Sequence, residues 1–258
     1  MGILVIPAAD RAVTTTEWLT SRHTFSFGDH YDPSNTHHGV LLVNNDDVVA
    51  PLQGFDPHPH RESEIVTWVT SGSLVHQDSE GHSGIVYPGL AQRMSAGTGV
   101  LHSERNDTWP ARPEAGGRPV RFVQMWIMPD ELELPPSYEQ SDIADDLLPD
   151  RVVPVASGDP TVDSAIRVAN RSATLYAARL DRGSSVELPD TRYTHIFVTH
   201  GVVQIGDATL GEGDAARGTD IGGVTVTGVA PAATDGADEV VAEVLVWSMA
   251  RDLRDLMS

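Results

Sequence analysis

The chain has 258 residues, of which 40% are hydrophobic, enough to bury a sizeable core in one large β domain or two small ones. It contains no cysteine, and all 17 basic residues are arginine, which excludes disulfides, zinc–thiolate sites, cysteine nucleophiles and Schiff-base lysines. Its net charge of −20 disfavours direct contact with nucleic acid or with anionic membranes, since both are negatively charged.

The N-terminal segment reads MGILVIPAAD. Its apolar run is short, has no basic region before it and contains Pro7, so it predicts a strand and not a signal peptide. No apolar stretch approaches the length needed to span a bilayer. We therefore expect a cytoplasmic protein that does not enter a membrane.

Short apolar or alternating runs, bounded by Gly, Pro, Asn and Asp, recur along the chain and predict many antiparallel strands. They are Gly39–Asn44, Ile65–Thr70, Ser83–Tyr87, Val120–Met128, Ser172–Leu180, Thr194–Thr199 and Glu239–Trp247. Two segments instead favour short helices. One is Gln140–Leu148, with Ser141 as a cap and Pro149 as a stop, and the other is Ala250–Met257.

A faint internal repeat divides the chain in two. In each copy a strand leads to a glycine, a second strand and a turn, and a further glycine precedes another strand. These glycines are Gly72 and Gly89 in the first copy, and Gly201 and Gly213 in the second. The repeat favours two tandem barrels of one design, although generic similarity between β-hairpins is the alternative explanation. A proline-rich stretch, Pro129–Pro160, places the boundary between predicted domains 1–135 and 136–258.

The strongest functional pattern consists of two pairs of polar residues about 40 positions apart. His58 and His60 lie in FDPHPHRESEIVTW, and His102 and Glu104 lie in GTGVLHSERND. Residues i and i+2 of a strand point to the same face, so each pair reaches one point, and neighbouring strands of a small barrel bring both pairs together. Three imidazole nitrogens and one carboxylate suit a transition metal and are too nitrogen-rich for Ca²⁺ or Mg²⁺.

The alternative to a metal site is that these histidines have no function, because a lone pair of alternating histidines is usually a surface feature. Two such pairs in a β context make a metal site the better hypothesis. Glu64 is a rival carboxylate, since it shares the strand parity of His58 and His60. We rank it below Glu104, as a group beside the ligands or the substrate.

The block from Phe55 to Glu104 resembles the signature of the pirin family. That family shows HPHRGxE, a hairpin GxxxHxDSxG, then PG and MxAGxGxxHSE, and this chain reads HPHRESE, GSLVHQDSEG, PG and MSAGTGVLHSE. RHTFSFGDHYDP upstream, and QMWIMP and PSYEQ downstream, also resemble pirins, so the likeness covers about half of the chain. The resemblance implies an all-β double cupin, built of two jelly-roll barrels with short helices.

The resemblance also implies a single iron ion, Fe(II), in the N-terminal barrel, although other divalent transition metals suit the same ligands. The family's ligands carry over to His58, His60, His102 and Glu104. Beside them, Glu62 stands where pirins usually have glycine, and Ser63 replaces a hydrophobic residue.

The second half has no matching ligands. The equivalent positions, counted from the repeat glycines, are Glu187, Pro189 and Val226. His195 and His200 are five apart and would lie on opposite faces of a strand. We therefore expect the C-terminal barrel to lack a metal, which agrees with the pirin pattern.

The implied activity is that of a metal-dependent dioxygenase similar to quercetin 2,3-dioxygenase, which cleaves a flavonol-type ring with O2. A carboxylate, Glu104 or a nearby group, would then serve as the base for the substrate hydroxyl, and the partners would be a small aromatic substrate and O2. Candidate residues for an apolar slot are Phe25, Phe27, Trp68 and Trp126, although each also suits a core. Two alternatives remain: a redox-responsive regulatory protein that binds a transcription factor or metabolic enzyme without turnover, and a cupin with a structural metal.

Overall fold

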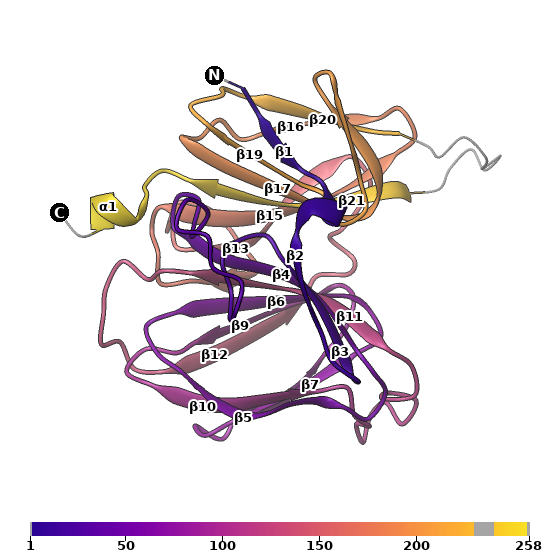
Figure 1. Cartoon of the computed structure of the whole chain (residues 1–258), viewed down its shortest axis with the longest axis vertical. Helices are drawn as coiled ribbons and strands as arrows, with labels where there is room; N and C mark the ends of the chain where they lie inside the picture. Colours follow the sequence, from indigo (N-terminus) through magenta and orange to yellow (C-terminus); the bar gives the residue numbers. More distant parts are fainter. Residues whose placement is uncertain (1, 230–239, 257–258) are drawn as a thin grey trace.

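In a computed structural model, which describes residues 2–229 and 240–256, the chain forms two β-barrels stacked on one another. Figure 1 shows the first barrel, in indigo to magenta, below the second, in orange to yellow. The predicted all-β double cupin is confirmed.

The first barrel closes a large sheet over a small one. In spatial order the large sheet contains β12 (Ser137–Asp142), β9 (Leu90–Ser95), β6 (Glu64–Ser71), β11 (Val120–Ile127), β4 (Leu41–Val49), β3 (Leu19–His23) and β2 (Ala12–Thr15). The small sheet contains β5 (Gly54–His60), β10 (Val100–Arg105), β7 (Leu74–Asp78) and β8 (Ser83–Val86). Neighbouring strands in both sheets run antiparallel.

The second barrel is organised around β17 (Tyr193–Ile205), which is long enough to serve two parts of the sheet. Its first half lies between β19 (Ala215–Thr219) and β21 (Val240–Met249), and its second half pairs with β18 (Ala208–Gly211) and β20 (Val224–Gly228). The remaining strands are β15 (Ala173–Asp181), β13 (Arg151–Ser157), β14 (Ile166–Arg167) and β16 (Ser185–Leu188). Residue Glu239, which begins the last predicted strand, lies outside the described residues.

Two strands join the barrel formed mainly by the other half of the sequence. β1 (Leu4–Ile6) pairs with β19 of the second barrel, and β12 pairs with β9 of the first. A 3₁₀ turn, η1 (Ala8–Asp10), leads from β1 back to β2 (Figure 1). These exchanges tie the barrels together at two places.

One predicted helix is wrong and the other is shorter than predicted. Gln140–Leu148 begins as the end of β12 and continues as turns, because Ile143 and Leu147 are drawn into the core between the barrels. The C-terminal helix is the single turn α1 (Leu253–Leu256), and Met257 lies outside the described residues. No helix in the described part of the chain is long and apolar enough to cross a membrane.

The two large sheets meet face to face across a shared hydrophobic core. It holds Trp68 and Met125 of the first barrel against Trp247 and Phe197 of the second. The Trp247 indole N–H donates to the Met125 sulfur at 3.2 Å, and the Trp68 N–H donates to Glu243 Oε1 at 3.0 Å. β6 is buried on both faces for this reason, which explains why its apolar residues, Ile65, Val66, Trp68 and Val69, fall on both faces.

Candidate metal centre

The small sheet of the first barrel brings the three predicted histidines together. β5 and β10 run antiparallel with His58 opposite His102, and His60 follows on the same face of β5. The ring centroids lie 4.5 Å apart for His58–His102 and 4.8 Å apart for both His58–His60 and His60–His102. Ligand atoms of all three lie within 4.8 Å of one another, close enough to share one ion.

Two of these rings carry buried nitrogens that lack a partner among the described residues. Nε2 of His60 and Nε2 of His102 have no hydrogen bond. Leaving such an atom unpaired costs about 1–3 kcal/mol unless a ligand binds it. Burial, reinforced by the neighbouring histidines, lowers the pKa of His60 to about 4 and the pKa of His102 to about 3. Both rings are therefore neutral at physiological pH, as metal ligation requires, so the site fits a transition-metal ion.

Glu104 completes the set from the same strand as His102. Its Oε2 lies 4.0 Å from His102 Nε2 and accepts a hydrogen bond of 2.7 Å from the Gln124 amide. Its Oε1 accepts a hydrogen bond of 3.4 Å from the Thr67 hydroxyl. The carboxylate is 2% exposed, and both donors come from the large sheet opposite, so the barrel wall holds it toward the histidines.

A chain of polar side chains stands behind His102. Nδ1 of His76 lies 3.4 Å from Nδ1 of His102, and Nε2 of His76 lies 3.2 Å from Asp78 Oδ2. Asp78 in turn contacts the partly exposed His82 at 3.0 Å. His76, His102 and Glu104 also form a second cluster with metal-ligand spacing. Because His76 meets the Nδ1 side of His102, it is placed to orient that ring, with Nε2 left for an ion.

The prediction that Glu64 faces the same interior is wrong. The chain reverses between β5 and β6, so strand parity does not carry across the turn. Glu62 occupies that turn at φ 50°, in the left-handed region, which explains why pirins usually have glycine there. The Glu64 carboxylate accepts hydrogen bonds of 2.9 Å from Ser95 and from the Ala169 amide, away from the histidines.

A cavity of about 360 Å³ opens beside His58, His60 and Glu104, within the size range of small-molecule sites. Its apolar lining is Leu19, Phe27, Phe55 and Trp126. Phe27 meets Trp126 edge to face at 5.6 Å, and Trp126 meets His60 at 4.8 Å. Of the predicted aromatic residues, Phe27 and Trp126 thus line the cavity, whereas Phe25 and Trp68 belong to the core between the barrels.

Sequence reasoning missed most of the polar wall of the cavity, which includes Ser21, Asn45, Asp47 and Gln124. Asn45 and Asp47 come from the run NNDD in the middle of β4. Four consecutive polar residues inside a buried strand were the available signal, because such a strand has polar partners on both faces. His23 is held by Thr14 Oγ1 at 2.8 Å and Asn45 Oδ1 at 3.0 Å, and burial lowers its pKa.

The histidines of the second barrel lie apart from one another. His195 is buried on β17, 5.7 Å from the ring of Phe25 of the first barrel. His200 is exposed and lies 3.4 Å from Glu212. Both metal-capable clusters found within residues 2–229 and 240–256 lie in the first barrel. A second barrel without metal stays a prediction.

Two stacked cupin barrels, with a His/Glu cluster inside the first, define a bicupin with a candidate metal site. Residues 7–127 match the family model described as Pirin, and residues 155–234 match the model described as Quercetinase C-terminal cupin domain. The chain belongs to the pirin family.

Relatives and solved structures agree with this assignment. A Mycobacterium tuberculosis protein named "Putative quercetin 2,3-dioxygenase" is 53% identical over 96% of this chain and 95% of its own. A "Pirin-like protein" of Caulobacter vibrioides is 34% identical over 81% of this chain and 88% of its own. The crystal structure of Escherichia coli YhhW, described as a bacterial pirin in complex with nickel(II), has a TM-score of 0.81 at 31% identity, covering 97% of this chain and all of that one.

Proposed function

We propose that this protein is a metal-dependent dioxygenase that acts on a flavonol-type aromatic substrate. The observation that carries the proposal is the convergence of three imidazoles and one carboxylate beside an aromatic-lined cavity. Relatives named as quercetin 2,3-dioxygenases support the choice of reaction. An aromatic slot of about 360 Å³ next to the ligands suits a planar polyphenol.

In this proposal one divalent metal ion, with Fe(II) as the first choice, is held by His58, His60, His102 and Glu104. The bound ion would supply a Lewis acid for the substrate oxygens and open coordination positions for O2. The protein supplies the rest. Phe27 and Trp126 stack the rings, the barrel excludes water, and a carboxylate, assigned from sequence to Glu104, takes up the hydroxyl proton.

Metal content provides the first test. We expect the wild-type protein to hold close to one transition-metal ion per chain, and His58→Ala and Glu104→Ala to lose most of it, because each removes one of four ligands. Elemental analysis after exchange into metal-free buffer measures this. His200→Ala is the matched control, since this histidine is exposed and lies on β17 of the second barrel. Full metal content in both ligand variants would contradict the assignment.

Turnover provides the second test. The iron-loaded protein should consume O2 with quercetin and release carbon monoxide, and the two ligand variants should not. Consumption of O2 separates an enzyme from a regulatory protein or a structural metal site, because neither of these turns substrate over. Metal binding without O2 uptake on any flavonol would overturn the proposed activity and leave the metal site standing.

A further inference from the structure

Asp47 is a buried aspartate that forms no ion pair with the described residues. It lies on β4, opposite Ser21 of β3 and Phe122 of β11, so its side chain shares the face that lines the first barrel. Its side chain is among the groups that line the cavity beside His58 and Glu104, and the residue is only 4% exposed. The preceding residue, Asp46, points the opposite way, toward Arg121.

The Asp47 carboxylate has spare hydrogen-bonding capacity. Ser21 is its hydrogen-bond donor, and its Oδ1 has no partner among the described residues. The two terminal nitrogens of the Arg11 guanidinium do not bond Asp47, because they donate to the carbonyls of Gly213, Arg22 and Asn44. A buried carboxylate oxygen without a donor is rare and costly, which points to a donor that a ligand brings.

The groups facing Asp47 do not offset its charge. β3 presents Ser21 and His23, β11 presents Phe122 and Gln124, β10 presents Glu104, and β5 presents His58 and His60. Gln124 is occupied with Glu104, and the buried His23 has a lowered pKa. Burial, with Asp46 and Glu104 adding to it against the opposing effects of Ser21 and Arg11, raises the pKa of Asp47 to about 7.

We propose that Asp47 is the proton acceptor for the substrate hydroxyl, and that Glu104 serves as a ligand. In this step the substrate O–H bond breaks, its proton forms an O–H bond with Asp47 Oδ1, and the electron pair stays on the substrate oxygen. The inference rests on the proposed function and deepens it, since it names the base of the same site. A proton acceptor at Asp47 also restricts the expected substrates to aromatic compounds with an ionisable hydroxyl next to the metal-binding oxygen.

Glu104 is less suited to this task. Both of its oxygens already accept hydrogen bonds, from Gln124 and from Thr67, so neither is free for the proton of the substrate hydroxyl. As a ligand, Glu104 would also have an oxygen occupied by the metal ion. Asp47 has one donor, Ser21, keeps Oδ1 free and is not assigned as a ligand, so of the two carboxylates it is the better placed proton acceptor.

Asp47→Asn tests the inference, because it keeps the shape and removes the proton acceptor. We expect the variant to keep its metal while kcat falls by about 100-fold or more, the usual contribution of a general base. Asp46→Asn is the matched control: it is equally buried, adjacent on β4, and faces away from the cavity. Asp46→Asn should lower the melting temperature but retain turnover and the pH dependence of kcat seen in the wild type.

Two further measurements isolate proton transfer from folding. Under nitrogen, the absorption spectrum of bound quercetin reports its ionisation; the midpoint should lie at least one pH unit higher in Asp47→Asn than in the wild type. In Asp47→Ala, added acetate or formate should restore part of the rate. An unchanged midpoint together with an unchanged kcat in Asp47→Asn would overturn the inference while leaving the dioxygenase intact. Absence of O2 uptake by the wild type would instead overturn the proposed function. The ionisation midpoint of bound quercetin would still show whether Asp47 accepts the proton.

Discussion

Gln124 fixes the position of the Glu104 carboxylate by being held at both ends of its own amide. Its N–H group donates to Glu104 at 2.7 Å, and its carbonyl oxygen accepts from the Trp126 indole at 3.0 Å. The indole therefore determines which end of the amide faces Glu104. Groups that orient a ligand in this way are commonly worth 10- to 100-fold in metal affinity.

We expect Gln124→Leu to weaken metal binding by about 10- to 100-fold, because Glu104 loses the donor that aims it. Trp126→Phe should give a smaller loss, since it frees the amide to rotate without removing it. Competition with a metal-binding dye measures both affinities. Equal affinity in the wild type and Gln124→Leu would mean that Glu104 needs no such support.

At the scale of residues, sequence could predict that the three histidines and Glu104 lie close together, since alternation along a strand is local information. It could not predict Gln124 or Asp47. Each acts on the site from the opposite sheet, and the pairing of β4 and β11 across from β5 and β10 depends on how the barrel closes. Glu64 was misassigned for the same reason, because a reversal of the chain resets the parity.

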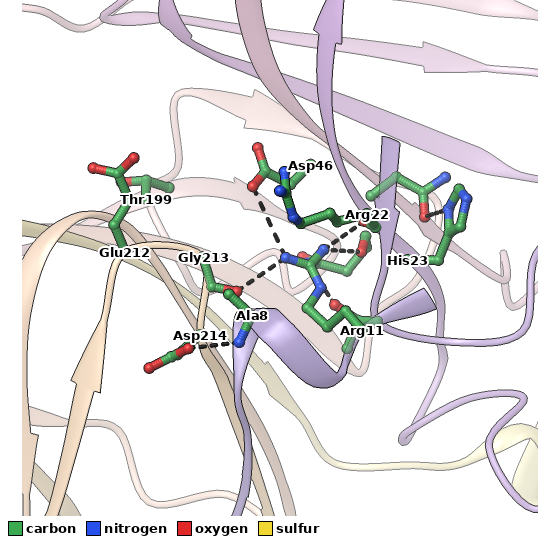
Figure 2. A network of polar contacts seen from close by, with 12 residues as sticks. Ala8, Arg11, Arg22, His23, Asp46, Thr199, Glu212, Gly213 and Asp214 are labelled. Carbon is green, nitrogen blue, oxygen red and sulfur yellow. Dashed lines mark hydrogen bonds and ion pairs between the residues drawn. The ribbon is translucent and has the colours of Figure 1, made fainter. Parts of the chain in front are cut away.

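β4 and β11 also carry a polar network on their outer face, where the barrels meet (Figure 2). Arg121 of β11 makes two bonds to Asp46, at 2.8 Å and 3.0 Å, and a further ion pair with Glu212 of the second barrel. Arg11 donates to the Gly213 carbonyl, and the Ala8 amide donates to Asp214 at 2.6 Å. The strand that supplies Asp47 to the cavity is therefore anchored to the other barrel.

Arg121→Met should lower the free energy of unfolding by about 3 kcal/mol, because it leaves the Asp46 carboxylate buried with only Arg11 nearby, at 3.9 Å. Asp46→Asn in the Arg121→Met background should recover part of the loss, since it removes the unpaired charge. Urea unfolding of the two single variants and the double variant measures the coupling. Additive losses would contradict a shared network.

At the scale of elements, the apolar runs of the sequence predicted the central strands to within a few residues. The failures fall where tertiary contacts override local pattern. Ser137–Asp142 became the edge strand β12 because β9 offered it unpaired backbone groups, and a capping residue cannot reveal such a partner. β17 extends to Ile205 rather than ending at Thr199, because Gly201 lets it cross into a second hairpin.

For the whole molecule, the repeat of glycines correctly indicated two barrels of similar design. It gave no sign that β1 and β12 join the opposite barrels, because short edge strands carry little sequence signal of their own. Nor could it show that both large sheets bury their outer faces against each other. A consequence is that polar residues such as His195, ordinary in a strand pattern, are enclosed between the barrels.

His195 makes the contact between the barrels sensitive to acid. Both of its ring nitrogens are buried without a hydrogen-bond partner in the described structure, and burial holds its pKa well below the usual value, with the charges of Arg217 and Arg11 and nearby His38 adding to this. Below about pH 6.5 the His195 ring binds a proton in the unfolded chain but stays neutral in the native protein. The free energy of unfolding therefore falls as the pH drops through this range.

We expect His195→Leu to raise the free energy of unfolding by about 1–3 kcal/mol, because it removes two unpaired polar atoms from the interface. The gain in the free energy of unfolding should be larger near pH 5.5 than near pH 7.5. At the lower pH the wild type is destabilised by His195, and the variant lacks this ring. Urea unfolding at both pH values measures the difference. His200→Leu, an exposed histidine on the same strand, should change stability by less than about 0.5 kcal/mol at either pH. An equal gain from His195→Leu at both pH values would show that the ring is hydrated in solution and that the barrels meet less tightly there than their shared core implies.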